Sequence, residues 1–123
     1  LSPVADLSSR DNSAHPYNYP LLPAKAINMY KRSYVADHDP CDPLISPVFG
    51  DLSRLPPVLV HASEHEMLYD DSRRYVNKAV AAGSPVTLQT WSHMVHVWHF
   101  FYPDLSEGRE AFAEIRKFFQ ENT

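Results

Sequence analysis

Three histidines recur at every third position in the segment WSHMVHVWHF, residues 91–100. These are His93, His96 and His99, and a second polar segment, SEHEMLYDDS at residues 63–72, adds carboxylates and a further imidazole. Imidazole acts in proteins either as a metal ligand or as a base that transfers protons near neutral pH. A catalytic base needs a carboxylate to orient it, whereas zinc needs several converging ligands. The two segments therefore predict an acid–base pair, a metal site, or imidazoles that are buried and hydrogen-bonded as part of a core.

Zinc is the weakest of these interpretations. His61, His65 and Glu66 would have to converge with the three histidines on one ion. The spacing H-x-x-H-x-x-H matches no strong zinc motif, and a loop that follows a strand spreads its side chains apart. We therefore expect no metal, and we expect His93 and His99 to be surface or packing residues.

Two parallel strands are expected to bring the polar segments to one edge of a sheet. PVLVHA, residues 57–62, is an apolar run typical of a buried strand, and PVTLQTW, residues 85–91, is rich in β-branched side chains. Between them, residues 68–82 show helical spacing, and Gly83 follows where a helix end favours a left-handed residue. A last helix is expected to begin at Ser106. This order predicts an α/β fold in which both polar segments follow the carboxyl ends of the strands.

The expected core is incomplete within these 123 residues. Trp91 and the phenylalanines of the last helix, Phe112 and Phe118 or Phe119, are predicted to be buried, because they fall on positions that face a sheet. Two strands alone cannot bury both faces of a sheet. We therefore expect an N-terminal portion to complete it, and a start at Leu1 without methionine is typical of a segment of something longer.

Composition argues against several functional classes. The formal net charge is −4, the basic residues form no run, and the three glycines form no phosphate-binding loop, so we expect no nucleic-acid partner. No apolar stretch is long enough to span a membrane, and no targeting segment is visible, so we expect a cytoplasmic location. The single cysteine, Cys41, excludes an internal disulfide and has no neighbour that would activate it.

The second half of the chain resembles a known family. Residues 42–101, DPLISPVFGDLSRLPPVLVHASEHEMLYDDSRRYVNKAVAAGSPVTLQTWSHMVHVWHFF, are similar to the C-terminal part of hormone-sensitive-lipase-like carboxylesterases, the bacterial family IV esterases and lipases of the α/β-hydrolase fold. The specific elements are an acidic residue followed by x-Leu-x-Asp, and a Met-x-His-x-aromatic turn after the next strand. The resemblance covers about residues 40–120 closely and LSPVADL, residues 1–7, loosely. It implies that this chain is the C-terminal part of an α/β-hydrolase fold.

Catalytic roles follow from the resemblance, residue by residue. The Met-x-His-x-aromatic turn begins at Met94, which makes His96 the catalytic base. The acidic motif begins at Glu66, where the family usually has aspartate, so Glu66 is the implied triad acid. Asp70 and Glu64 are the alternatives for that role.

The nucleophile that this family requires has no counterpart in the sequence. Its serine sits in a G-x-S-x-G turn ahead of the acid and the histidine, and no such motif occurs here. Ser84 is expected at the opposite edge of the sheet. The nucleophile and the oxyanion hole would therefore come from an N-terminal portion of the same enzyme, and we expect the chain alone to be inactive.

The resemblance also implies a division of the chain and a substrate. Turn formers in residues 1–20 predict a strand end and a loop, and apolar spacing from residue 21 predicts an amphipathic helix. The resemblance makes residues 21–40 cap-associated and residues 41–123 the βαβα part of the hydrolase core. Trp98 and Phe100 would lie near the substrate pocket. Short-chain acyl or aryl esters, no cofactor, and a possible homodimer through the last strand are implied. The alternative is a non-catalytic interaction domain derived from half of a hydrolase.

Overall fold

A small parallel sheet with helices on both faces forms the centre of the molecule. The computed structural model describes residues 1–8, 16–17 and 21–123. Its helices and strands are α1 (Ala24–Val35), β1 (Val58–Ser63), α2 (Tyr69–Ala81), β2 (Val86–Trp91) and α3 (Ser106–Asn122), with short 3-10 helices η1 (Pro47–Phe49) and η2 (Trp98–Phe101). The predicted strand–helix–strand–helix order is confirmed, with each element within two residues of its expected start.

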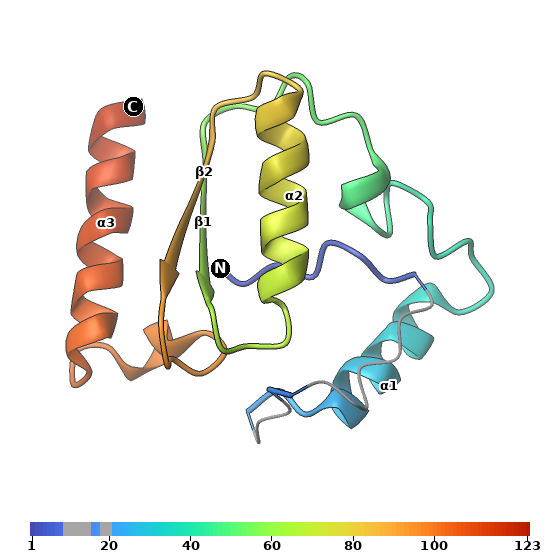
Figure 1. Cartoon of the computed structure of the whole chain (residues 1–123), viewed down its shortest axis with the longest axis horizontal. Coiled ribbons are helices and arrows are strands. Elements are labelled where there is room, and N and C mark those ends of the chain that lie inside the picture. The colour runs from blue at the N-terminus through green and yellow to red at the C-terminus, as the bar shows by residue number, and fades with distance from the viewer. Residues whose placement is uncertain (9–15, 18–20) are drawn as a thin grey trace.

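The two strands pair in parallel, with Val58 opposite Val86 and Ser63 opposite Trp91. Helix α2 lies on one side of the sheet and α3 on the other (Figure 1). The main core lies between α2 and the sheet and consists of Leu52, Val60, Val76, Ala79 and Val86. This layered packing explains why residues 57–62 are apolar apart from His61, since both faces of β1 are covered.

Helix α2 is built to run between the strands as a crossover. Asp70 and Asp71 occupy its first turn, where the partial positive charge of the helix N-terminus favours carboxylates. At its end, Gly83 has a φ of 86°, a left-handed conformation that costs other residues about 1–2 kcal/mol. The hydroxyl of Ser84 then donates to the carbonyl of Leu52 at 2.5 Å, and this contact closes the end of the core far from the polar segments.

The expectation of a phenylalanine core on α3 is wrong for Phe112, and of the two alternatives Phe118 and Phe119 only Phe118 is partly buried. Phe112 and Phe119 are 41% and 59% exposed, whereas Ala111 is fully buried. Phe118 and Trp91 are only half-buried. The physical reason is that α3 covers just two strands, so its larger side chains extend beyond the edge of the sheet that the described residues provide.

Helix α1 lies apart from the sheet, beside the loop that leads into α2 (Figure 1). It begins at Ala24, directly after Pro23, rather than at residue 21 as the apolar spacing predicts. Ala24 and Ile27 pack against Met67 and Leu68, which lie in the loop that follows β1. Within the described part of the chain, no helix has the length and apolar character that crossing a membrane requires.

Candidate active site

The two polar segments meet where β1 and β2 end. The chain leaves β1 at Ser63 and β2 at Trp91, and the turns that follow lie at the same end of the sheet (Figure 1). Backbone pairing continues one step beyond the strands, since the amide of Glu64 donates to the carbonyl of Trp91 at 3.0 Å. The acid loop, residues 63–68, and the histidine loop, residues 92–97, are therefore held side by side.

Glu66 and His96 form a direct pair across these loops. His96 Nδ1 lies 3.0 Å from Glu66 Oε1, within hydrogen-bond distance. The Glu66 side chain is 2% exposed, whereas that of His96 is 23% exposed. An ionised carboxylate can only accept, so Nδ1 carries the proton and Nε2 is left as an acceptor. A buried carboxylate thus orients a partly accessible imidazole, which is the geometry of an acid–base pair.

The second carboxylate oxygen of Glu66 is held by two other donors. Glu66 Oε2 accepts from the Ser2 hydroxyl at 2.9 Å and from the backbone N–H of Ser63 at 3.0 Å. Both donors are buried. Hydrogen bonds of this kind compensate the loss of water around a buried carboxylate. They also leave Oε1 directed at His96.

The other candidate carboxylates lie elsewhere. The Asp70 side chain is 38% exposed and pairs with Arg73 at 2.7 Å. Glu64 accepts from the hydroxyls of Thr90 and Ser92 at 2.9 and 2.7 Å, and these hydrogen bonds lower the pKa of its carboxyl group. The structure therefore brings Glu66 to His96 and gives Asp70 and Glu64 other partners.

The three histidines of residues 91–100 contact three different partners. His96 meets Glu66, His99 Nε2 lies 3.0 Å from His61 Nδ1, and the exposed ring of His93 stacks on that of His65 with centroids 4.2 Å apart. Among residues 1–8, 16–17 and 21–123, no group of three or more histidine, cysteine or acidic side chains is arranged to hold a metal ion.

His99 ends a partly buried row of polar contacts that the sequence did not reveal. Gln89 donates from Nε2 to Glu114 at 2.9 Å, and its Oε1 lies 2.9 Å from His61 Nε2. His61 Nε2 therefore donates, its Nδ1 accepts from His99, and His99 Nδ1 is left deprotonated. This last atom is buried without a hydrogen-bond partner in the described residues. These hydrogen bonds are consistent with two neutral imidazoles, and they hold η2 against β1.

Folding stability should therefore depend on the protonation of His99. Burial, reinforced by the nearby His61, lowers the pKa of His99 from 6.5 to about 4. The unfolded chain takes up this proton near pH 6.5, and the folded chain takes it up only near pH 4. The contribution of neutral His99 to folding stability is therefore fully present above pH 6.5 and is lost as the pH falls toward 4. We expect a loss of about 3 kcal/mol. Urea unfolding at several pH values measures it, and an identical loss in His99→Gln would contradict the assignment.

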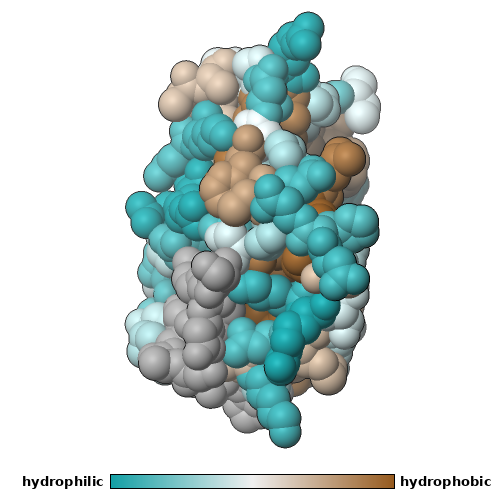
Figure 2. Space-filling model, turned by 90° about the vertical axis from the view of Figure 1, so that its right-hand side faces the viewer, coloured by the Kyte–Doolittle hydropathy of each residue, from teal (hydrophilic) through white to brown (hydrophobic). Residues whose placement is uncertain are grey.

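His96 borders a hollow of about 440 Å³ between the acid loop and α1. The rest of its lining is mainly apolar and aromatic and includes Leu22, Ile27, Tyr30, Leu44 and Leu68. The face that carries α1 is largely hydrophilic, with apolar surface visible between the polar side chains (Figure 2). The imidazole thus lies at the wall of a space suited to an apolar group.

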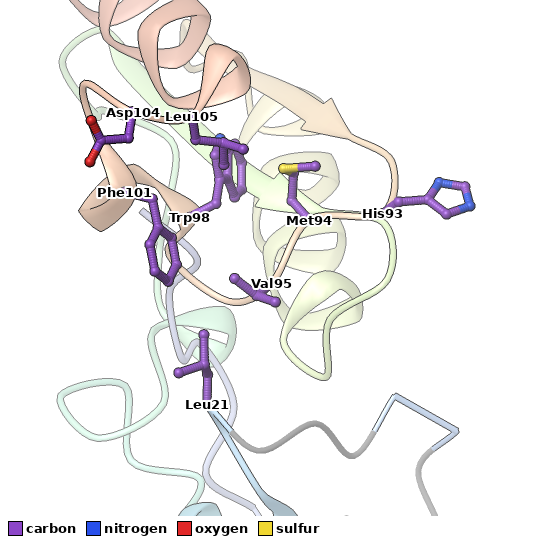
Figure 3. A pocket seen from close by; sticks show the side chains of 8 residues that line it. All are labelled: Leu21, His93, Met94, Val95, Trp98, Phe101, Asp104 and Leu105. Atoms are coloured by element: carbon purple, nitrogen blue, oxygen red, sulfur yellow. The ribbon is translucent and has the colours of Figure 1, made fainter.

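A second hollow, of about 460 Å³, lies on the outer side of the histidine loop. Its lining includes Met94, Val95, Trp98 and Phe101, whereas His93 points away from these side chains (Figure 3). Trp98 is fully buried, and Phe100 is 85% exposed. Trp98 lines this second hollow, and neither Trp98 nor Phe100 lines the hollow beside His96.

Two residues of the site were missed by the sequence analysis. Ser2 and Ser63 bind the carboxylate of Glu66, yet serines are common in turns and carry no spacing signal. Ser2 lies in the LSPVADL segment, which the resemblance covers only loosely. The only feature of the sequence that could have indicated Ser2 is its position before Pro3 at an expected strand end. Ser84, set aside as a nucleophile, lies at the opposite end of the sheet, as predicted.

Comparison with known proteins identifies the family. Residues 1–100 match the family model described as "alpha/beta hydrolase fold", and the chain belongs to this family. It is 40% identical over 113 residues to an acetyl-hydrolase from Streptomyces hygroscopicus, with 90% of this chain and 38% of the relative covered. It is 35% identical over 124 residues to an esterase from Acinetobacter venetianus, covering 96% of this chain and 40% of the relative.

Solved structures agree in fold. An esterase from the bacterial hormone-sensitive lipase family superposes with a TM-score of 0.90 at 35% identity, over 99% of this chain and 42% of that one. A hormone-sensitive lipase from a metagenome library gives 0.88 at 32% identity, over 100% and 43%. The predicted α/β-hydrolase fold and the resemblance to hormone-sensitive-lipase-like esterases are thereby confirmed. The chain spans about two fifths of the length of these relatives.

Proposed function

We propose that this chain supplies the base and the acid of a carboxylic ester hydrolase, while the nucleophile lies outside these 123 residues. The observation that carries the proposal is the 3.0 Å contact between His96 Nδ1 and the buried Glu66. Relatives named as an acetyl-hydrolase and an esterase support the reaction class.

His96 is the general base in this proposal. Its Nε2 has no hydrogen-bond partner in the part of the chain that the structure describes, and the ring borders the apolar hollow. A serine hydroxyl from the remaining part of the enzyme would approach Nε2 and transfer its proton as the oxygen attacks the ester carbonyl. The imidazolium would then return the proton to the leaving alcohol. Glu66 would stabilise that imidazolium and hold the ring in place.

The hollow beside His96 favours small apolar acyl or aryl groups. Aliphatic and aromatic side chains form most of its wall, and they come from α1, from residues 44–47 and from Val4, Leu7, Leu22 and Leu68. We propose that α1 belongs to a cap over this space. This assigns the substrate contacts to residues such as Leu22 and Tyr30, in place of Trp98 and Phe100.

The remaining portion of the enzyme is the main partner in this proposal. It would supply the serine, the backbone amides of the oxyanion hole and further strands beside β1. The outer edge of β2 is unpaired in the described residues, which is compatible with a homodimer formed there. A cytoplasmic location is also part of the proposal.

Ester hydrolysis tests the proposal. The complete enzyme is expected to hydrolyse p-nitrophenyl acetate and butyrate, and the 123-residue chain alone neither. Spectrophotometric release of p-nitrophenol measures both. A complete enzyme that cleaves neither ester would favour the interaction-domain alternative.

A further inference from the structure

Ser63 is a buried serine that contacts both loops of the candidate site. It is the last residue of β1, is fully buried and lies opposite Trp91 in the sheet. Its backbone N–H donates to Glu66 Oε2 at 3.0 Å, and its hydroxyl donates to the backbone carbonyl of Met94 at 2.7 Å. One residue therefore touches the acid itself and the backbone two positions before His96.

The direction of the Ser63 hydroxyl follows from its partners. The backbone N–H of His65 donates to Ser63 Oγ at 3.1 Å, so the oxygen already accepts one hydrogen bond. The carbonyl of Met94 can only accept, and a serine hydroxyl has a single proton, so that proton lies between Ser63 and Met94. The hydroxyl therefore links the two loops as a donor from the acid loop to a carbonyl of the histidine loop.

Other side-chain links between the loops are more exposed. Glu64 binds the hydroxyls of Thr90 and Ser92 at the surface, where water competes for the same groups. The link from Ser63 to Met94 starts from a side chain with no exposed surface. A hydrogen bond shielded from water is electrostatically stronger and holds its geometry more firmly.

We propose that Ser63 is a positioning residue for the reaction. Its hydroxyl fixes the histidine loop at the separation at which His96 Nδ1 meets Glu66. This inference rests on the proposed function. It assigns Ser63 no contact with substrate, so its loss should affect turnover and leave substrate binding unchanged. Displacements of an ångström or less at a reacting group are enough to slow catalysis strongly.

Alanine at position 63 isolates the hydroxyl, because it keeps the backbone N–H that binds Glu66. In the complete enzyme, we expect Ser63→Ala to lower kcat about ten- to a hundredfold and to leave KM within about twofold. The NMR resonance of the His96 Nδ1 proton should shift or broaden in the same variant. Ser63→Thr keeps a hydroxyl and should restore most of kcat.

Ser72→Ala is the matched control. Ser72 is also fully buried, but its hydroxyl has no hydrogen-bond partner among the described residues. The same change of serine to alanine should leave kcat and the Nδ1 resonance as they are in the unmodified enzyme. The pair of variants separates the loss of the link from a general effect of removing a buried hydroxyl.

Three results would overturn the inference. The first is an unchanged kcat and Nδ1 resonance in folded Ser63→Ala. The second is an equal loss of kcat in Ser72→Ala, and the third is a folded Ser63→Thr with no recovery. If Ser63→Thr does not fold, the comparison of Ser63→Ala with Ser72→Ala decides. Failure of the proposed function looks different, because the unmodified complete enzyme would then cleave neither ester, or His96→Ala would retain full turnover.

Discussion

Replacing His96 by alanine is expected to lower kcat of the complete enzyme toward p-nitrophenyl butyrate roughly 10⁴- to 10⁶-fold. Without the imidazole, the serine hydroxyl has no base to take its proton, and the leaving alcohol has no acid. The fold should survive, because the His96 side chain is partly accessible and its described hydrogen bond is to Glu66 alone. Steady-state kinetics and circular dichroism measure the two effects.

His93→Ala is the control for this change. His93 lies three positions earlier in the same loop, and its exposed ring stacks on His65. Activity of His93→Ala should stay within about twofold of the unmodified enzyme. Full activity in His96→Ala, or an equal loss in both variants, would remove His96 from the mechanism.

Replacing Glu66 by glutamine should have the second-largest effect, a fall in kcat of about 10³- to 10⁴-fold. The amide has nearly the same shape but no charge, so it no longer stabilises the imidazolium that forms during attack. Its N–H₂ group can also donate to Nδ1, which favours the wrong tautomer of His96. KM should change little, since Glu66 is buried behind the imidazole.

Asp70→Asn distinguishes the two candidate acids. Asp70 is an exposed partner of Arg73, and such surface ion pairs contribute at most about 1 kcal/mol to stability. We expect Asp70→Asn to retain full turnover. A larger loss in Asp70→Asn than in Glu66→Gln would assign the acid to Asp70 and contradict the geometry observed here.

The sheet and its crossover helix were predictable because their signals are local. An apolar run bounded by prolines and a polar cluster, a helical stripe ended by Gly83, and a β-branched segment each specify one element. Once those elements are parallel neighbours, the meeting of Glu66 with His96 follows from topology, because both residues come just after the ends of their strands. The choice of Glu66 over Asp70 needed the three-dimensional positions.

Contacts between distant segments were not predictable. The bonds from Ser2 to Glu66 and from Ser63 to Met94 join residues 64 and 31 positions apart, and neither leaves a periodic pattern. The contact between the buried His61 and His99 was not predictable for the same reason. The exposed phenylalanines of α3 show the opposite failure, since helical spacing identifies a face of the helix but does not say whether enough sheet lies beneath it.

We propose that one catalytic site is divided between this chain and residues beyond it. The most direct test treats the complete enzyme with a serine-directed fluorophosphonate and locates the adduct by mass spectrometry. We predict that the reagent labels one serine outside these 123 residues, and that His96→Ala abolishes the labelling. An adduct on a serine within the chain, or labelling that does not depend on His96, would contradict the account.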